Sequence, residues 1–227
     1  MTINEAVIFD MDGVLVDSNR AHYQSWVEVA AEKGLAYGEA EFQKTLGRTS
    51  RELIAQLWGD ILSEAEIAEL DLRKEAVFRR IVDADYPAMP GSIELLDTLD
   101  AAGFRIALGS SAPAENVEQA LQRMQLRGRL QAIVSGSEVT RGKPDPEIFL
   151  TAADRLGVAP NRCVVVEDAV AGIAAAAAAG MACVGMASTG HTHESLAAAD
   201  LIVDSLAELT PAVFRRLIAA RANGNGR

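Results

Sequence analysis

The chain has 227 residues, of which 49% are hydrophobic, and its 21 basic against 32 acidic residues give a net charge of −11. That length suffices for one large domain, or for a core domain with a smaller companion. The negative charge argues against a nucleic acid or an anionic membrane surface as partner, because both require a basic footprint. A small anionic substrate fits only if a metal ion and local cations offset the overall field.

The N-terminus lacks a basic segment followed by a long apolar run, so we expect no signal peptide. The most apolar stretch, 173–187, is interrupted by Gly180 and is shorter than the roughly 20 residues of a membrane helix. Cys163 and Cys183 lie in Val-rich segments and are expected to be buried free thiols. We therefore expect a cytoplasmic protein.

Six short apolar segments predict the strands of a parallel sheet that is buried on both faces. These segments are 6–9, 105–108, 132–134, 163–166, 182–185 and 200–203. From residue 90 onward, segments with helical periodicity separate them, at 92–102, 114–124, 146–156 and 169–179. Strands that alternate with helices predict an α/β fold, a Rossmann-like doubly wound parallel sheet.

Residues 17–88 interrupt this alternation. Their periodicity predicts four helices, over 21–33, 39–46, 50–57 and 63–84, with no strand between them. We therefore predict a catalytic core formed by 1–16 and 89–227, and an inserted helical cap domain formed by 17–88. The Gly- and Asn-rich tail, 222–227, is expected to be frayed.

Two carboxylates follow the first predicted strand. In open parallel sheets ligands bind beyond the carboxyl ends of the strands, where Asp10 and Asp12 stand one residue apart. Gly13 permits a sharp turn directly after them. An isolated pair of this kind could equally be a solvated loop, but the apolar runs on both sides favour a crevice.

Polar groups also follow three later strands. Ser110 could bind a phosphate at a helix N-terminus, or simply cap that helix. Lys143, between Gly142 and Pro144, offers a compact ammonium suited to a phosphoryl group, although most lysines lie on the surface. Glu167 and Asp168 follow the most apolar strand.

Adjacent acids at the end of a buried strand are costly unless a cation compensates them. Together with Asp10 they offer the oxygen ligands that Mg²⁺ prefers, although Asp168 could instead cap the next helix.

These positions resemble the four sequence motifs of the haloacid dehalogenase superfamily. The matching segments are Asp10-Met11-Asp12-Gly13-Val14, Ser110, Gly142-Lys143-Pro144-Asp145-Pro146 and Glu167-Asp168-Ala169-Val170-Ala171-Gly172-Ile173. The resemblance covers nearly the whole chain and implies a Rossmann-like core with an inserted four-helix cap.

The resemblance also implies roles for these side chains. Asp10 would attack phosphorus and Asp12 would act as general acid and base. Ser110 and Lys143 would hold the transferring phosphoryl group. Mg²⁺ would be bound by Asp10, the backbone carbonyl of Asp12, Glu167 and Asp168.

Within the superfamily, dehalogenases lack the second aspartate, so Asp12 argues against that activity. Phosphonatases use a cap lysine, and no motif around Lys33, Lys44 or Lys74 supports one. Two activities remain: a phosphatase acting on small phosphorylated metabolites such as sugar phosphates, and β-phosphoglucomutase.

His22 and Arg51 stand in segments that resemble the mutase cap, where the histidine couples closure to catalysis and the arginine holds the second phosphate. After Ser110, however, 112–114 read Ala-Pro-Ala where the mutase has serine, lysine and asparagine. This difference favours the phosphatase. We expect His22, Arg51, Ser111 and Asn116 to contact substrate.

A non-catalytic regulator that binds phosphometabolites is a third hypothesis. The complete set of Asp10, Asp12, Lys143 and Asp168 argues against it, because a protein without turnover has no need of all four. We expect a monomer or a weak homodimer.

Overall fold

The computed structural model describes residues 4–42, 49–187 and 191–222. Its centre is a six-stranded sheet in the order β3-β2-β1-β4-β5-β6, with every neighbouring pair parallel. The strands are β1 (Ala6–Phe9), β2 (Arg105–Gly109), β3 (Ala132–Val134), β4 (Cys163–Glu167), β5 (Ala182–Met186) and β6 (Leu201–Val203). This confirms the predicted doubly wound sheet. Because β1 and β4 are neighbours at the point where the strand order reverses, their carboxyl ends form the expected ligand crevice.

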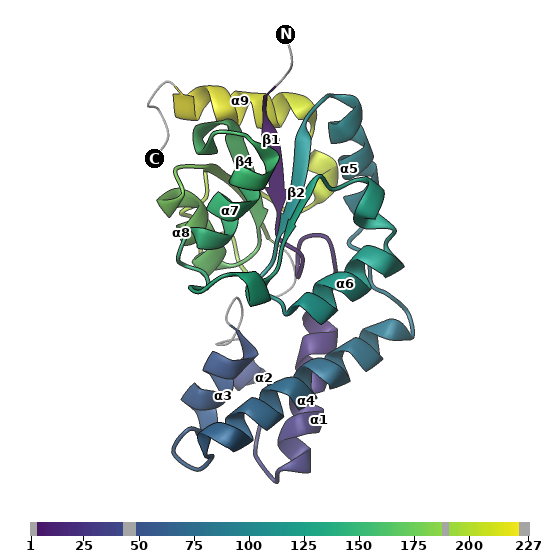
Figure 1. Cartoon of the computed structure of the whole chain (residues 1–227), viewed down its shortest axis with the longest axis vertical. Coiled ribbons are helices and arrows are strands. Elements are labelled where there is room, and N and C mark those ends of the chain that lie inside the picture. Colours follow the sequence, from purple (N-terminus) through teal and green to yellow (C-terminus); the bar gives the residue numbers. More distant parts are fainter. Residues whose placement is uncertain (1–3, 43–48, 188–190, 223–227) are drawn as a thin grey trace.

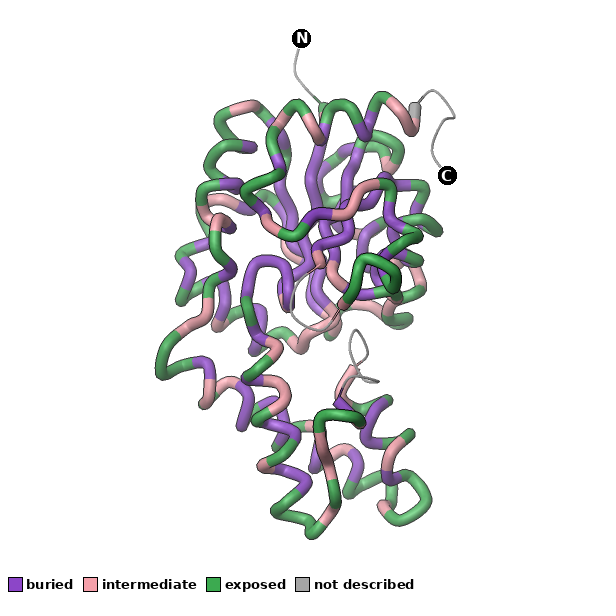
Figure 2. Tube along the Cα trace, turned by 180° about the vertical axis from the view of Figure 1, so that it is seen from behind, coloured by how far each residue is buried: buried purple, intermediate pink, exposed green. Residues whose placement is uncertain are grey.

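Helices cover both faces of the sheet (Figure 1). Along β1, Val7 and Phe9 join one apolar cluster while Ala6 and Ile8 join the other, as the two-residue period of a strand requires. The first cluster includes side chains from α5 (Ser92–Ala101), α6 (Ala114–Arg123) and α9 (Pro211–Ala222). The second includes α7 (Glu147–Leu156) and α8 (Val170–Ala178). Figure 2 shows the central strands as buried along most of their length.

The helices of the predicted cap lie together beyond the carboxyl edge of the sheet (Figure 1). They are α1 (Asn19–Glu32), α2 (Glu39–Phe42), α3 (Ser50–Trp58) and α4 (Glu64–Asp83). A separate apolar cluster that includes Trp26, Trp58 and Leu70 holds them together. Capping boxes at Thr49 and Ser63 fix the starts of α3 and α4.

Two antiparallel linkers connect the cap to the core. The backbone N–H of Asp17 donates to the carbonyl of Pro87 at 2.7 Å, and that of Met89 donates to Leu15 at 2.8 Å. These linkers lie at the predicted domain boundary, so both crossings between cap and core occur side by side.

Most predicted elements are confirmed to within about two residues at their ends. The exceptions are α9, which the sequence analysis did not predict, and the helix predicted over 39–46, whose part beyond Phe42 lies outside the described residues. Most of the predicted frayed tail lies outside them as well. Short 3₁₀ helices occupy Leu126–Gly128, Gly136–Glu138, Pro160–Arg162 and Leu206–Glu208.

Both cysteines are buried free thiols, as predicted. Within the described residues, no helix combines the length and the apolar character that crossing a membrane requires.

Candidate active site

A pocket of about 360 Å³ lies between the carboxyl edge of the sheet and the cap. All the predicted site residues line it. From the core these are Asp10, Asp12, Ser110, Ser111, Asn116, Lys143, Glu167 and Asp168, and from the cap they are His22 and Arg51. The structure therefore brings together residues that are far apart in the sequence, while their chemical roles stay predictions.

A tight loop after β1 positions the two aspartates. The N–H of Asp10 donates to the carbonyl of Val166 at 2.9 Å, which continues the pairing with β4 beyond the end of the strand. The chain then turns so that the N–H groups of Leu15 and Val16 both donate to the carbonyl of Met11 at 2.9 Å. Gly13 has φ of 75°, a conformation that glycine adopts without strain.

Lys143 connects the ends of β1 and β4. Its Nζ donates to Oδ1 of Asp10 at 2.6 Å and to Oε2 of Glu167 at 3.0 Å, and it lies 4.9 Å from the ring centroid of Phe149. The lysine side chain is only 3% exposed. Burial alone would lower the pKa of Lys143, but Asp10 and Glu167 more than reverse this effect, so the pKa lies above its usual value and the side chain is an ammonium.

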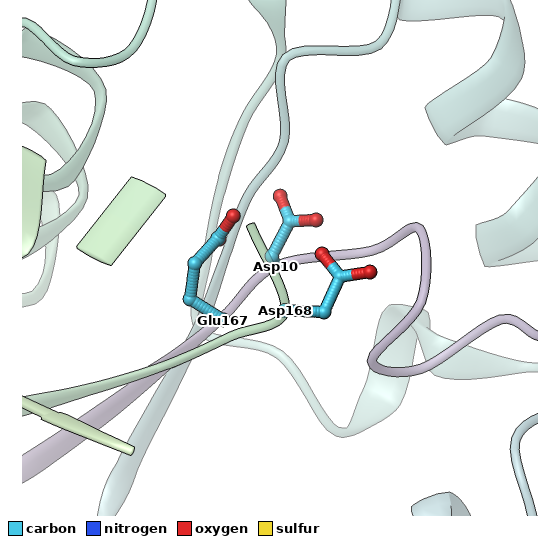
Figure 3. A group of neighbouring side chains, drawn as sticks. All are labelled: Asp10, Glu167 and Asp168. Carbon is cyan, nitrogen blue, oxygen red and sulfur yellow. The ribbon is translucent and has the colours of Figure 1, made fainter. Parts of the chain in front are cut away.

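Asp10, Glu167 and Asp168 form a compact acidic group, with one oxygen from each lying within 4.8 Å of the others. Figure 3 shows their carboxylates converging from the ends of the two strands. Burial raises the pKa of all three, that of Glu167 to about 8, against the opposing effect of Lys143. Repulsion from Asp12 adds to the effect at Asp10, and repulsion from neighbouring acids adds to it at Glu167 and Asp168. One ammonium does not balance three carboxylates of which two, Asp10 and Glu167, are buried, and their all-oxygen donor set fits a hard divalent cation.

Gly172 explains how Glu167 reaches this group. A Cβ on Gly172 would stand 2.0 Å from Cδ of Glu167, so only glycine leaves room for the carboxylate against α8. The glycine belongs to the predicted fourth motif, but its role could not be read from the sequence.

Asp12 contacts the cap through His22. Nε2 of His22 lies 3.3 Å from Oδ1 of Asp12, and its ring stacks on Phe78 with centroids 4.0 Å apart. Burial would raise the pKa of Asp12, but the interactions with His22, Ser18 and Lys74 outweigh it, so the pKa lies below the usual value. Asp12 is therefore a carboxylate near neutral pH.

Four charged residues of α4 line this pocket although none of them is among the site residues predicted from the sequence. They are Asp71, Lys74, Glu75 and Arg79. Nζ of Lys74 lies 2.9 Å from Nδ1 of His22 and donates to Oε1 of Glu75 at 2.9 Å. A signal did exist, because Lys74 shares the helix face of Leu70, Val77 and Phe78, a face otherwise made of core residues.

The remaining predicted residues have different surroundings. Ser110 is buried, and its hydroxyl accepts the N–H of Ala112 at 3.1 Å, just before α6 begins. Asn116 is also buried, and both ends of its amide bind cap side chains. Arg51 is 57% exposed and pairs with Glu64 at 3.1 Å, so its guanidinium stands at the rim.

The sequence matches the family model described as haloacid dehalogenase-like hydrolase over residues 5–180. The chain belongs to this family. The motif assignment made from the sequence is thus confirmed at the level of the family.

Members of this family with high similarity to the chain include phosphatases and a phosphomutase. Validoxylamine A 7'-phosphate phosphatase of Streptomyces hygroscopicus subsp. limoneus is 32% identical, over 90% of this chain and 95% of that protein. Beta-phosphoglucomutase of Bacillus subtilis is 33% identical, over 91% and 92%. Fructose-1-phosphate phosphatase YqaB of Escherichia coli is 35% identical, over 77% and 92%.

Solved structures agree with this family placement. A beta-phosphoglucomutase from Clostridium difficile superimposes with a TM-score of 0.86 at 27% identity, covering 96% of this chain and 99% of that one. The chain is therefore an enzyme of the phosphatase and phosphomutase group of haloacid dehalogenase-like hydrolases.

Proposed function

We propose that this family member is a Mg²⁺-dependent phosphatase that hydrolyses small phosphorylated metabolites of the sugar-phosphate class through a phosphorylated Asp10. One observation carries the proposal: the carboxylate of Asp10 is buried in the pocket with Lys143 at 2.6 Å, opposite the contact between Asp12 and His22. This arrangement offers a nucleophile, a cation for the phosphoryl oxygens and an acid–base group within one cavity.

In the first half of the reaction, a carboxylate oxygen of Asp10 attacks the phosphorus of the substrate. The bond from phosphorus to the ester oxygen breaks. Asp12, which is a carboxylate in the free enzyme, must take up a proton from solvent as the substrate binds, and it donates this proton to the ester oxygen so that an alcohol leaves. The ammonium of Lys143 and the hydroxyl of Ser110 hold the transferring group, whose negative charge is the main obstacle to attack.

In the second half, a water molecule attacks the phosphorus of the aspartyl-phosphate. Asp12 takes a proton from this water, the bond from phosphorus to Asp10 breaks, and inorganic phosphate leaves. The lowered pKa of Asp12 favours its base form in this half. Entry of water depends on the cap, because the cap forms the opposite wall of the pocket.

The acidic group at the ends of β1 and β4 would hold Mg²⁺, with Asp10, Glu167 and Asp168 as side-chain ligands and the backbone carbonyl of Asp12 as a further one. When bound, the metal neutralises charge between the carboxylate nucleophile and the phosphate. The raised pKa values of the three acids support this assignment, because a divalent cation would supply the charge that Lys143 alone does not.

The pocket supports a substrate the size of a sugar phosphate. Its volume of about 360 Å³ lies at the small end of ligand sites. Relatives named for fructose-1-phosphate and for phosphorylated carbohydrates point to the same class. We propose that His22, Arg51 and Ser111 contact the part of the substrate that is not transferred, and we expect a cytoplasmic monomer or weak homodimer.

A β-phosphoglucomutase is the second candidate. It is favoured by the similarity to the enzymes from Bacillus subtilis and Clostridium difficile and by the position of His22 beside Asp12. In that activity a sugar hydroxyl replaces water as acceptor. The Ala-Pro-Ala stretch at 112–114 favours the phosphatase, because Ala112 and Pro113 line the pocket and the stretch brings no cation to it.

The test is phosphate release with Mg²⁺ from hexose, pentose and triose phosphates, glycolate phosphate and β-glucose 1-phosphate, with Asp10→Asn as control. Release that requires Asp10 supports the phosphatase. Conversion of β-glucose 1-phosphate into glucose 6-phosphate without release supports the mutase. If neither reaction is observed, both proposed activities are contradicted and a non-catalytic phosphometabolite-binding protein is favoured.

A further inference from the structure

A chain of polar contacts leaves the core at Asp12, passes through the cap and returns to the core at Asn116. Asp12 faces Nε2 of His22, and Nδ1 of His22 faces Nζ of Lys74. Lys74 donates to Oε1 of Glu75, whose Oε2 accepts from Nδ2 of Asn116 at 2.6 Å. The cap is therefore attached to the core at both ends of one continuous network.

The directions of these hydrogen bonds settle which ring nitrogen of His22 carries the proton. An ammonium has donors only, so the contact of 2.9 Å between Lys74 and Nδ1 requires that nitrogen to accept. The proton of a neutral imidazole then stands on Nε2, which faces the carboxylate of Asp12. Stacking on Phe78 keeps the ring in this plane.

Glu75 is the group that keeps Lys74 in this role. Lys74 is 2% exposed, with the rings of Trp26 and Phe78 each 5.3 Å from Nζ, so its charge needs a buried counter-ion. Glu75 supplies it at 2.9 Å. The same pairing argues against a Schiff-base role for Lys74, which requires a neutral amine.

Glu75 is fixed in turn from both sides of the pocket. Ser50, at the start of α3, donates to Oε1, and Asn116, on α6 of the core, donates to Oε2. Arg79 donates to Oδ1 of Asn116 at 2.7 Å, which orients the amide with its NH₂ group toward Glu75. Both oxygens of the Glu75 carboxylate therefore accept hydrogen bonds, and these bonds hold the carboxylate in one orientation.

We propose that Glu75 and Asn116 are positioning residues for the reaction at Asp12. Asn116 holds Glu75 only when the cap lies against the core. Glu75 holds Nζ of Lys74 beside Nδ1 of His22, and this contact directs Nε2 of His22 toward Asp12. Closure of the cap thereby sets the position of Nε2 of His22, 3.3 Å from Oδ1 of Asp12. The catalytic consequence rests on the proposed function, whereas the tautomer of His22 does not.

The first test is the ¹⁵N–¹H correlation spectrum of the histidine rings in the Mg²⁺-loaded protein. The chain has three histidines, so His22→Gln assigns the signals of His22 by difference. The proposal requires an Nε2-protonated ring in the wild type and a shift away from this single tautomer in Glu75→Gln and Asn116→Ala. An Nδ1-protonated ring in the wild type, or an unchanged spectrum in both variants, would overturn it.

The second test compares kcat and KM for the best substrate of the panel. We expect kcat to fall about tenfold in Glu75→Gln and Asn116→Ala with KM changed less than about twofold, as for misalignment of a reacting group. Gln119→Ala is the matched control, since Gln119 joins the same helix pair through the carbonyl of Arg79 and Asp83 without touching the network. An equal loss in Gln119→Ala would show general loosening of the cap and contradict the proposal.

The two readouts separate the possible failures. If the wild-type protein has no activity on the panel, the proposed function is contradicted. The ¹⁵N–¹H spectrum would still test whether Glu75 and Asn116 position His22. If Glu75→Gln does not fold, Asn116→Ala and the wild-type tautomer decide it.

Discussion

Nζ of Lys143 lies 2.6 Å from Oδ1 of Asp10, inside a site where three carboxylates converge. The lysine holds the nucleophile in place and provides positive charge where a phosphoryl group would arrive. We therefore expect Lys143→Met to lower kcat by at least about a hundredfold, the effect of removing one preorganised charged donor from a transition state.

Steady-state phosphate release checks this expectation. Lys33→Met is the control, because Lys33 pairs with Glu69 on the surface of the cap. A Lys143→Met enzyme with near wild-type kcat would contradict the role given to this lysine.

Gly172→Ala tests the close approach of Glu167 to α8. The new Cβ would stand 2.0 Å from Cδ of Glu167, so the carboxylate must move away from Lys143. We expect destabilisation by about 1–3 kcal/mol from overpacking, together with weaker Mg²⁺ binding. Urea unfolding and Mg²⁺ titration measure the two effects. Gly128→Ala, whose Cβ would meet nothing within 4 Å, should change neither.

The pKa of Glu75 predicts a pH dependence of stability. Burial would raise this pKa, but Lys74, His22 and Ser50 lower it from 4.5 to about 2 in the folded chain. Because the folded pKa lies below the unfolded one, the stabilisation is present above about pH 4.5 and is lost as the pH falls toward 2. It amounts to an order of 3 kcal/mol.

Urea unfolding of the wild type and Glu75→Gln at pH 6 and at pH 2.5 measures this contribution. The difference in the free energy of unfolding should be large at pH 6 and should shrink at pH 2.5. A difference that is independent of pH would show that Glu75 is not a carboxylate with a strongly lowered pKa.

Removal of the metal should destabilise the protein and stop the reaction. A Mg²⁺ concentration 100 times the dissociation constant stabilises a folded site by about 2.7 kcal/mol, so the melting temperature should rise with Mg²⁺ and fall with EDTA. Asp168→Asn should weaken this response, whereas Asp60→Asn on the exposed turn after α3 should keep it. Equal responses in both variants would place the metal elsewhere.

The sequence predicted the sheet well because its strands are short apolar runs that end at polar residues. The same pattern indicated Asp10, Asp12, Lys143 and Glu167, since the carboxyl ends of parallel strands meet in space. The helix α9 had usable signals too: Thr210 and Pro211 are a common start, and Val213, Phe214, Leu217 and Ile218 have helical spacing.

The cap network could not be predicted in the same way. Lys74 meets His22 across 52 residues through the packing of two helices of the cap. Asn116 meets Glu75 across 41 residues through docking of a helix of the cap on a helix of the core. No local pattern encodes such contacts. The charged pair Lys74 and Glu75 on the apolar face of α4 was the one available signal in the sequence. The residues that this pair contacts are known only from the structure.

The central claim is that Asp10 becomes phosphorylated during turnover. Rapid mixing of enzyme, Mg²⁺ and the best substrate, followed by an acid quench and mass spectrometry, tests it most directly. We expect the added mass of one phosphoryl group, located on the peptide that contains Asp10 and absent from Asp10→Asn. Phosphorylation that persists in Asp10→Asn, or turnover in which no residue ever carries a phosphoryl group, would contradict it.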